Sequence, residues 1–433
     1  MKAHTKKAMQ PSRYLVVGFF IIIITGSLLL ALPVAHRPGI VLSYSDALFT
    51  AVSAVCVTGL VTVDIALSFN LFGRTVIALL IMVGGMGFAG MIVSIALFLG
   101  LEVGISQRNM LSEAYNLGTL SGTLRIVKTV VFASLIFQIF GTVAGYWVFR
   151  PHYQTLEAWG HSLFHAVSAF NNAGFDLMGN FQSMMEYRQN IVFNAITMFL
   201  IISGGLGFFV IADVLRKRFV WGKFTMHTKI VVIATLFLIF TGTVVFLLVE
   251  RIDFLSALFL SVTARTAGFN TIQTNTLSQA TLFFLIILMF VGASPGSTGG
   301  GIKTTTMFAI LLSLLSLVFR RQPAAFKRRI SDDSILKAFQ VLLLAFLVVC
   351  SGTFIIIVVE KTKFSFLQVL FESVSAFATV GLSTGITPQL SVISKIILMV
   401  TMFVGRLGPI TIATSVSAKE SVLKHIEERV FIG

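Results

Sequence analysis

The sequence predicts an all-α membrane protein assembled from four tandem repeats of helix, half-helix and helix. The composition predicts a membrane protein, because 56% of the 433 residues are hydrophobic and only 11% are charged. Soluble proteins average about 25% charged residues. The apolar content is enough for eight membrane spans of about 20 residues each. An internal repeat in the sequence predicts the division into four units. Together these features exclude a soluble enzyme, a disulfide-stapled secreted domain and a disordered binding protein.

The repeat is marked by the pattern L-F-x-x-V-[S/T]-A, which occurs at residues 48–54, 163–169, 258–264 and 370–376. A glycine follows each copy within five residues, and these glycines are Gly59, Gly174, Gly268 and Gly381. Because a pattern repeated along a chain marks repeated structural units, we divide the sequence into four repeats. Their boundaries are 1–105, 106–222, 223–325 and 326–433, the last including the C-terminal tail.

Within each repeat, one long apolar run precedes the glycine and a second follows it. The outer runs cover residues 14–34, 126–149, 230–249 and 335–359, and the inner runs cover 71–99, 191–215, 277–319 and 392–415. A segment of about 10 to 12 residues between them ends at the glycine and is too short to cross a ~30 Å hydrocarbon core. We therefore expect eight spans and four re-entrant pore half-helices, whose non-helical ends must be buried in protein or border a wet cavity.

The first apolar run has the appearance of a secretory signal, since Lys2, Lys6, Lys7 and Arg13 precede it. It exceeds the roughly 7 to 15 residues of a signal core and lacks an A-x-A cleavage site, so we expect an uncleaved first span. Of the 32 Lys and Arg residues, 21 fall on the side that would hold both termini and eight on the opposite side. This imbalance predicts cytoplasmic termini and accounts for the net charge of +15 without a nucleic-acid partner.

The four glycine segments predict a cation filter. Backbone carbonyls can replace the hydration shell of K⁺ where four strands present them to one axis, and glycine permits the backbone angles that this requires. The segments resemble degenerate copies of the T-V-G-Y-G potassium filter and share only the glycine, so we expect a pseudo-tetrameric, potassium-channel-like pore with K⁺ at the filter carbonyls. They are Val57-Thr58-Gly59-Leu60, Asn172-Ala173-Gly174-Phe175, Thr266-Ala267-Gly268-Phe269 and Thr379-Val380-Gly381-Leu382.

The third inner run is interrupted at residues 292–306. Its flanks are each too short to span alone, which predicts one broken span whose polar backbone borders water; the alternative is a cytosolic loop between two helices. Glycine strings at 84–87, 204–207 and 405–408 predict matching bends or tight contacts in the other inner runs. The interruption contains Gly292, Pro295, Gly296, Ser297, Thr298, Gly299, Gly300, Gly301 and Lys303.

Two arginines fall at membrane depth. Arg406 lies within the fourth inner run, where a charge at the bilayer centre costs about 2.5–3.5 kcal/mol on insertion scales. We expect it to face the cavity beneath the filter, close to the interrupted segment, and to oppose cation passage until that segment rearranges; the alternative is a structural pair with an acid. Arg265 is expected to point behind the filter and pair with a carboxylate, for which Glu372 is a candidate.

The string T-A-R-T-A-G-F-N at 263–270 and the string P-G-S-T-G-G-G-I-K-T-T-T at 295–306, together with one glycine per filter, resemble the Trk/Ktr/HKT superfamily of potassium transporters. The resemblance covers essentially the whole chain and is strongest to the Ktr branch. It implies a homodimer in the bacterial inner membrane, a cytosolic KtrA-like nucleotide-binding regulatory ring, and potassium uptake with sodium as an activator or co-ion. It also implies that residues 292–306 form a gate. In some plant members serine replaces the first filter glycine and accompanies sodium transport, so Gly59 favours potassium.

Three alternatives stay open at this stage: a Trk-type or sodium-permeable cation transporter of the same superfamily, a non-transporting membrane scaffold, and the potassium-binding subunit of an ATP-driven pump. Enzyme motifs are not supported. The segment 296–304 lacks the lysine that must follow the last glycine of a Walker A loop, and the G-x-G-x-x-G match at 85–90 lies inside an apolar run with no strand before it. We therefore expect no catalytic residues.

Overall fold

The computed structural model describes residues 11–99, 101–114 and 123–416; the basic residues Lys2, Lys6 and Lys7 and the C-terminal tail lie outside this part of the chain. Apart from a hairpin of two-residue strands, β1 (Ala324–Ala325) and β2 (Arg328–Arg329), the regular elements of the described residues are helical. The predicted all-α class is therefore confirmed for this part of the protein.

Four helices are long and apolar enough to cross a membrane, and they coincide with the predicted outer runs. Hydroxyl caps fix where two of them begin: Thr225 accepts from the backbone N–H of Thr228 and Ser331 from that of Ser334, which satisfies amides that the first turn leaves unpaired. The four outer helices are α1 (Pro11–Ala31), α7 (Thr123–Phe149), α11 (Met226–Val249) and α15 (Asp332–Glu360).

A shorter helix precedes each repeat glycine. These helices do not reach the glycine as predicted but end three to five residues before it, because a residue with positive φ stops the helix first. Two of them also exceed the predicted length, with 16 and 13 residues. These half-helices are α2 (Tyr44–Val55), α8 (Thr155–Phe170), α12 (Phe254–Thr263) and α16 (Phe366–Ala378).

All four inner runs are broken, not the third alone. Three are sharply bent, by 102°, 93° and 94°, at Gly87, Gly207 and Gly408, which have φ of 73°, 90° and 87°. Such angles are easily adopted only by glycine, so the predicted bends are confirmed. Counting each bent pair as one span raises the number of candidate spans to seven by length and composition. The inner pairs are α4 (Leu71–Met86) with α5 (Phe88–Phe98), α9 (Ile191–Leu206) with α10 (Phe208–Arg216), α13 (Gln279–Phe290) with α14 (Thr304–Val318), and α17 (Val392–Leu407) with α18 (Pro409–Val416).

Short elements connect these helices. Two are α-helical, and five are single 3₁₀ turns. They are α3 (Ile65–Ser68), α6 (Ile105–Ala114), η1 (Pro33–Ala35), η2 (Met185–Tyr187), η3 (Trp221–Lys223), η4 (Thr274–Thr276) and η5 (Thr387–Gln389).

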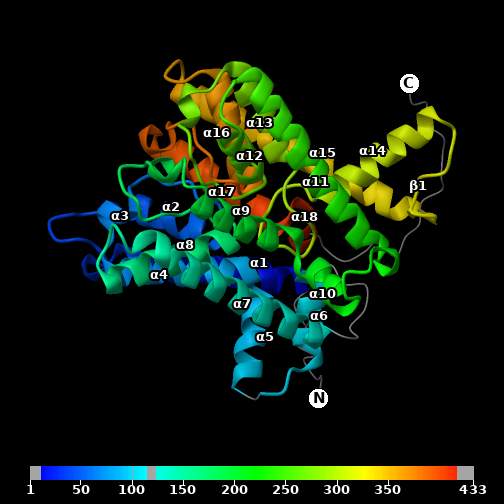
Figure 1. Ribbon diagram of the computed structural model, residues 1–433, viewed down its shortest axis with the longest axis horizontal. Coiled ribbons are helices and arrows are strands. Elements are labelled where there is room, and N and C mark those ends of the chain that lie inside the picture. The colour runs from blue at the N-terminus through cyan, green and yellow to red at the C-terminus, as the bar shows by residue number, and fades with distance from the viewer. Residues whose placement is uncertain (1–10, 100, 115–122, 417–433) are drawn as a thin grey trace, which may run out of the picture.

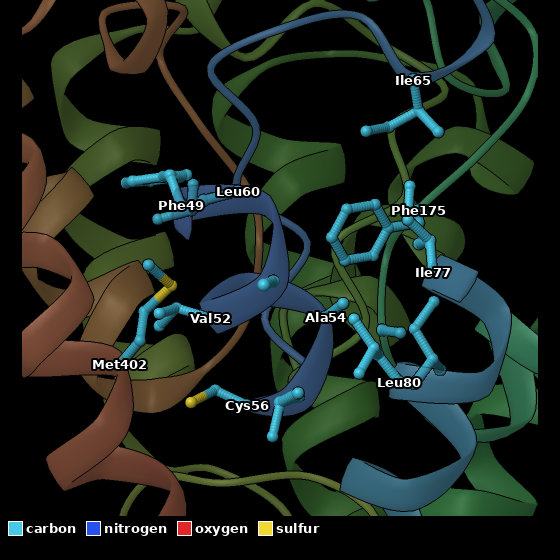
Figure 2. Packing of buried hydrophobic residues seen from close by; sticks show 14 of the residues in the cluster. Phe49, Val52, Ala54, Cys56, Leu60, Ile65, Ile77, Leu80, Phe175 and Met402 are labelled. Carbon is cyan, nitrogen blue, oxygen red and sulfur yellow. The ribbon is translucent and has the colours of Figure 1, made fainter. Parts of the chain in front are cut away.

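The half-helices form the centre of the core. Figure 2 shows Val52 of α2 directed toward Met402 of α17, and Ala54 on the opposite flank directed toward Leu80 of α4 and Phe175. The helix is therefore enclosed by the first, second and fourth repeats. Figure 1 shows the same centre as overlapping half-helices and inner helices, while α14 and the β1–β2 hairpin project away from it at the right.

The first and last repeats lie side by side, although they are farthest apart in sequence. Lys395 of α17 forms a largely buried salt bridge of 3.0 Å with Asp46 in the first turn of α2. Arg13 of α1 donates from Nε to the carbonyl oxygen of Ser415 in α18 at 2.6 Å. The four repeats therefore close into a ring.

Candidate functional site

The four repeat glycines meet at the centre of this ring. A Cβ atom built on any one of them would lie against a backbone carbonyl oxygen of the next repeat, at 2.5–2.7 Å in the first three cases. The fourth glycine contacts the first repeat, which closes the circle in chain order. The contacting pairs are Gly59 with Ala173, Gly174 with Ala267, Gly268 with Val380, and Gly381 with Thr58.

Along each filter segment, the sign of the backbone angle φ alternates from residue to residue. The glycines have φ between 68° and 93°, and the residue two positions earlier in each segment also has positive φ. Alternation between left- and right-handed angles turns successive carbonyls toward the same side of a strand, the arrangement that lines a cation pathway. The four earlier residues with positive φ are Val57, Asn172, Thr266 and Thr379.

All sixteen predicted filter residues are buried. The side chains of the fourth positions, Leu60, Phe175, Phe269 and Leu382, are at most 1% exposed and pack into the protein. The tertiary structure thus brings the four glycines of the predicted filter together and buries the other twelve residues. The ring has no room for a side chain larger than hydrogen at its glycines.

In three of the four repeats, the serine or threonine of the repeat pattern supports the predicted filter from behind, a role that the sequence reasoning missed. Ser53 accepts from the backbone N–H of Gly59 at 3.1 Å, and Ser375 accepts from that of Gly381 at 3.1 Å. Thr263 instead donates its hydroxyl to a filter carbonyl, that of Phe269, at 2.7 Å. The signal was present in the sequence, because this is the one polar position common to all four copies of the pattern.

The interrupted segment 292–306 lies against the filter and not outside the core. Gly300 donates its backbone N–H to Thr379 Oγ1 at 2.9 Å, and Thr298 donates its hydroxyl to Asn172 Oδ1 at 3.3 Å. A Cβ on Gly299 would collide with Thr266 Oγ1. The segment therefore contacts the first residue of three of the four filter segments. A cytosolic loop between two helices could not make these contacts, so that alternative is excluded.

The remaining residues of this segment hold it in place. Gly292 donates to Ile302 O at 2.8 Å, so the two ends of the segment pair with each other, and Lys303 Nζ donates to Gly299 O at 2.6 Å. At the bend of the second repeat, the carbonyl of Pro295 lies 2.6 Å from where a Cβ on Gly207 would be, and Gly296 O accepts from Phe208 N at 2.9 Å. Ser297 is partly buried, and its hydroxyl has no hydrogen-bond partner.

Arg406 joins the segment to another inner helix. Its guanidinium donates to the carbonyl of Thr298 and, on the other side, to the carbonyls of Gly84 and Gly85 at the end of α4. The C-terminal end of a helix carries partial negative charge that favours a cation there. The predicted position of Arg406 beside the interrupted segment is confirmed.

The predicted pairing of Arg265 with Glu372 is wrong. Glu372 is 1% exposed, and hydroxyls of Ser383, Thr384 and Thr387 and the backbone N–H of Thr384 donate to its carboxylate at 2.8–3.1 Å. These donors fill its acceptor positions and fix the chain that leaves the fourth filter segment. Among the salt bridges of the described residues, none involves Arg265.

Comparisons with known sequences agree with this geometry. The family described as "TrkH: Cation transport protein" matches residues 3–423. The chain is 38% identical to the Ktr system potassium uptake protein B of Bacillus subtilis (strain 168), covering 98% of this chain and 97% of that protein. It is 36% identical to the potassium/sodium uptake protein NtpJ of Enterococcus hirae, covering 100% and 99% respectively.

A solved structure has the same fold. The crystal structure of the potassium transporter TrkH from Vibrio parahaemolyticus matches with a TM-score of 0.73 at 19% identity, covering 96% of this chain and 86% of that one. These matches extend over nearly the whole chain, and the family comprises transporters and not enzymes. The protein is thus a multi-pass membrane protein that belongs to the TrkH family of cation transport proteins.

Proposed function

We propose that this protein takes up potassium across the cell membrane through the ring of filter segments, under the control of the segment 292–306. The observation that carries the proposal is the closed ring of four glycines in which positive φ recurs at alternate positions. Carbonyls gathered in this way can replace the water around a K⁺ ion. The half-helices end just before the ring, so their partial negative charge also favours a cation.

The gate is proposed from the contacts beneath the ring. Hydrogen bonds and close packing hold the segment against Asn172, Thr266 and Thr379, and Arg406 attaches it to α4. An ion leaving the filter on this side would meet the segment and a guanidinium. Opening therefore requires these contacts to break.

The finer features are proposals as well. We place both termini in the cytoplasm on the strength of the basic-residue count, and we count α13 and α14 as one broken eighth span. We propose a KtrA-like regulatory ring on the basic face, since two relatives are named as Ktr system potassium uptake proteins. A homodimer and stimulation by sodium are proposed on the resemblance of the sequence motifs alone.

A sodium-permeable transporter is the second candidate. One relative is named a potassium/sodium uptake protein, and only the glycine is common to the four filter segments. Glycine at position 59 favours potassium, because the resemblance to the superfamily implies that serine at this position accompanies sodium transport.

The test is cation uptake by the purified protein in proteoliposomes, with K⁺ and Na⁺ measured separately and K⁺ uptake measured with and without Na⁺. We expect saturable K⁺ uptake that exceeds Na⁺ uptake and rises when Na⁺ is added. Shortening the stretch 296–301 should speed uptake and weaken its regulation. Failure of the protein to transport either ion, or to rescue a potassium-uptake-deficient strain, would favour a non-transporting scaffold.

A further inference from the structure

The hairpin of β1 and β2, which joins α14 to α15, is strongly basic. Residues 320–329 contain five lysines and arginines and no acidic residue, and all five basic side chains are exposed. Nothing in the proposed transport pathway uses this hairpin, which projects away from the centre of the molecule (Figure 1). The basic residues are Arg320, Arg321, Lys327, Arg328 and Arg329.

Four of these five cations form no ion pair with the described part of the chain. Arg329 pairs with Asp332 at 2.7 Å, and none of the other salt bridges of the described residues involves the hairpin. Like charges gathered within ten residues repel one another, and a bound anion relieves this repulsion. The cluster therefore favours a negatively charged ligand.

The turn of the hairpin has an unfavourable backbone conformation. Its two central residues, Phe326 and Lys327, have φ of 51° and 62°, whereas two-residue turns with positive φ at both positions favour Asn-Gly. Lys229, in the first turn of α11, has its Nζ 5.7 Å from the centre of the Phe326 ring, within the range of a cation–π contact. This contact holds the tip of the hairpin against α11, so the basic side chains project from a fixed support.

Apolar side chains flank the hairpin on both sides. The end of α14 exposes Leu317, Val318 and its C-cap residue, Phe319. Leu336, in the second turn of α15, is exposed as well. In a membrane protein such side chains are covered by lipid, because their transfer from water to acyl chains is favourable. The ends of both helices therefore lie among acyl chains, and the cations between them lie at the depth of the lipid phosphates.

We propose that this hairpin binds the headgroups of anionic phospholipids, with the guanidinium groups of Arg320, Arg321 and Arg328 on the phosphates. Guanidinium groups match phosphate geometry because they can donate two parallel hydrogen bonds. A zwitterionic headgroup brings no net charge to the cluster, so the site selects lipids by charge. The exposed apolar residues on both sides favour lipid over the other class of ligand, a cytosolic protein with an acidic face.

The experiment measures which lipids surround the hairpin. Phe319 is 66% exposed, so Phe319→Trp places a fluorescent reporter beside Arg320 without disturbing the core. The full-length variant is reconstituted in mixed bilayers of phosphatidylglycerol and phosphatidylcholine, and each lipid in turn carries brominated acyl chains, which quench tryptophan on contact. We expect phosphatidylglycerol to be enriched at least about fivefold at the reporter, the effect of roughly one basic residue near a membrane surface. The native tryptophans, which are first replaced with phenylalanine, are Trp147, Trp159 and Trp221.

Two changes should remove this enrichment. The combined variant Arg320→Gln, Arg321→Gln and Arg328→Gln should abolish it, and about 1 M salt should reduce it with the hairpin intact, since salt screens charges. The matched control also removes three exposed cations, but from just after the ends of α7, α11 and α15, and should keep the enrichment. Its substitutions are Arg150→Gln, Arg251→Gln and Lys361→Gln.

Equal quenching by the two lipids with the hairpin intact would overturn the proposal and favour an acidic protein as the ligand. Loss of the enrichment in the control variant would also overturn it, because the net charge of the protein, and not the hairpin, would then attract the lipid. If the combined variant does not fold, the salt series and the control decide the matter. These measurements do not involve transport, so their outcome is independent of the proposed function.

Discussion

Replacing Arg406 with glutamine should open the proposed gate. The guanidinium donates both to the segment 292–306, at Thr298 O, and to the end of α4, at Gly84 O and Gly85 O. A hydrogen bond from a charged group contributes about 1.5–3 kcal/mol. Losing the bond to Thr298 alone would shift the closed-to-open equilibrium by roughly ten- to a hundredfold. Because the charge below the filter is lost as well, both effects raise cation flux.

The assay is the initial rate of K⁺ uptake into proteoliposomes, with melting temperature and elution volume checked for each variant. Lys303→Gln is the matched control: it removes a positive charge from the same segment, and the hydrogen bond of Lys303 Nζ among the described residues stays within the segment, at Gly299 O. If Arg406→Gln folds normally and its uptake rate and sodium stimulation stay at wild-type values, the reasoning fails. An equal gain in Lys303→Gln would show that charge, and not the attachment to α4, sets the barrier.

Three further predictions concern the filter and the capping contacts at the start of α11. Gly59→Ser should raise Na⁺ uptake relative to K⁺ in the same proteoliposomes, since its Cβ would lie 2.5 Å from Ala173 O; an unaltered ratio would contradict the filter assignment. Ser375→Ala removes a hydrogen bond to Gly381 and should cost about 1 kcal/mol of stability, whereas Ser168→Ala, which loses an unpartnered hydroxyl, should melt close to wild type. Asp213 accepts hydrogen bonds from Thr225 and Thr228 and forms a salt bridge of 2.7 Å with Lys217. Asp213→Asn removes the salt bridge and weakens these hydrogen bonds, so it should lower the melting temperature; an unchanged melting temperature would contradict this role.

The elements that could be predicted are those governed by local rules. Long apolar runs can satisfy their backbone only as helices, and the four outer helices lie within a few residues of the predicted bounds. The ends of the half-helices were harder to predict. Residues such as Val57 and Thr379 stop them by adopting positive φ, an angle that L-residues rarely adopt unless the surrounding protein imposes it.

For the charged residues at membrane depth, the sequence likewise predicted some positions correctly and others not. That Arg406 belongs beside the interrupted segment followed from its cost in a bilayer, and the structure supplies carbonyls of Thr298 and Gly84 as its partners. The partner suggested for Arg265 was wrong, because three hydroxyls closer in sequence to Glu372 already bind that carboxylate. Which donor reaches a buried acid depends on packing between helices, and the sequence pattern carries no such information.

The sequence by itself determined the membrane class, the four repeats and the glycines on which the filter is built, because hydrophobicity, periodicity and the freedom of glycine are properties of the chain alone. Only the tertiary structure decided that these glycines meet in one closed ring, that the interrupted segment lies against three filter segments, and that Lys229 holds the turn of the basic hairpin at Phe326. Each of these facts joins residues about 30 to more than 300 positions apart. Such contacts are set by how the helices of different repeats pack, a choice that no single segment encodes.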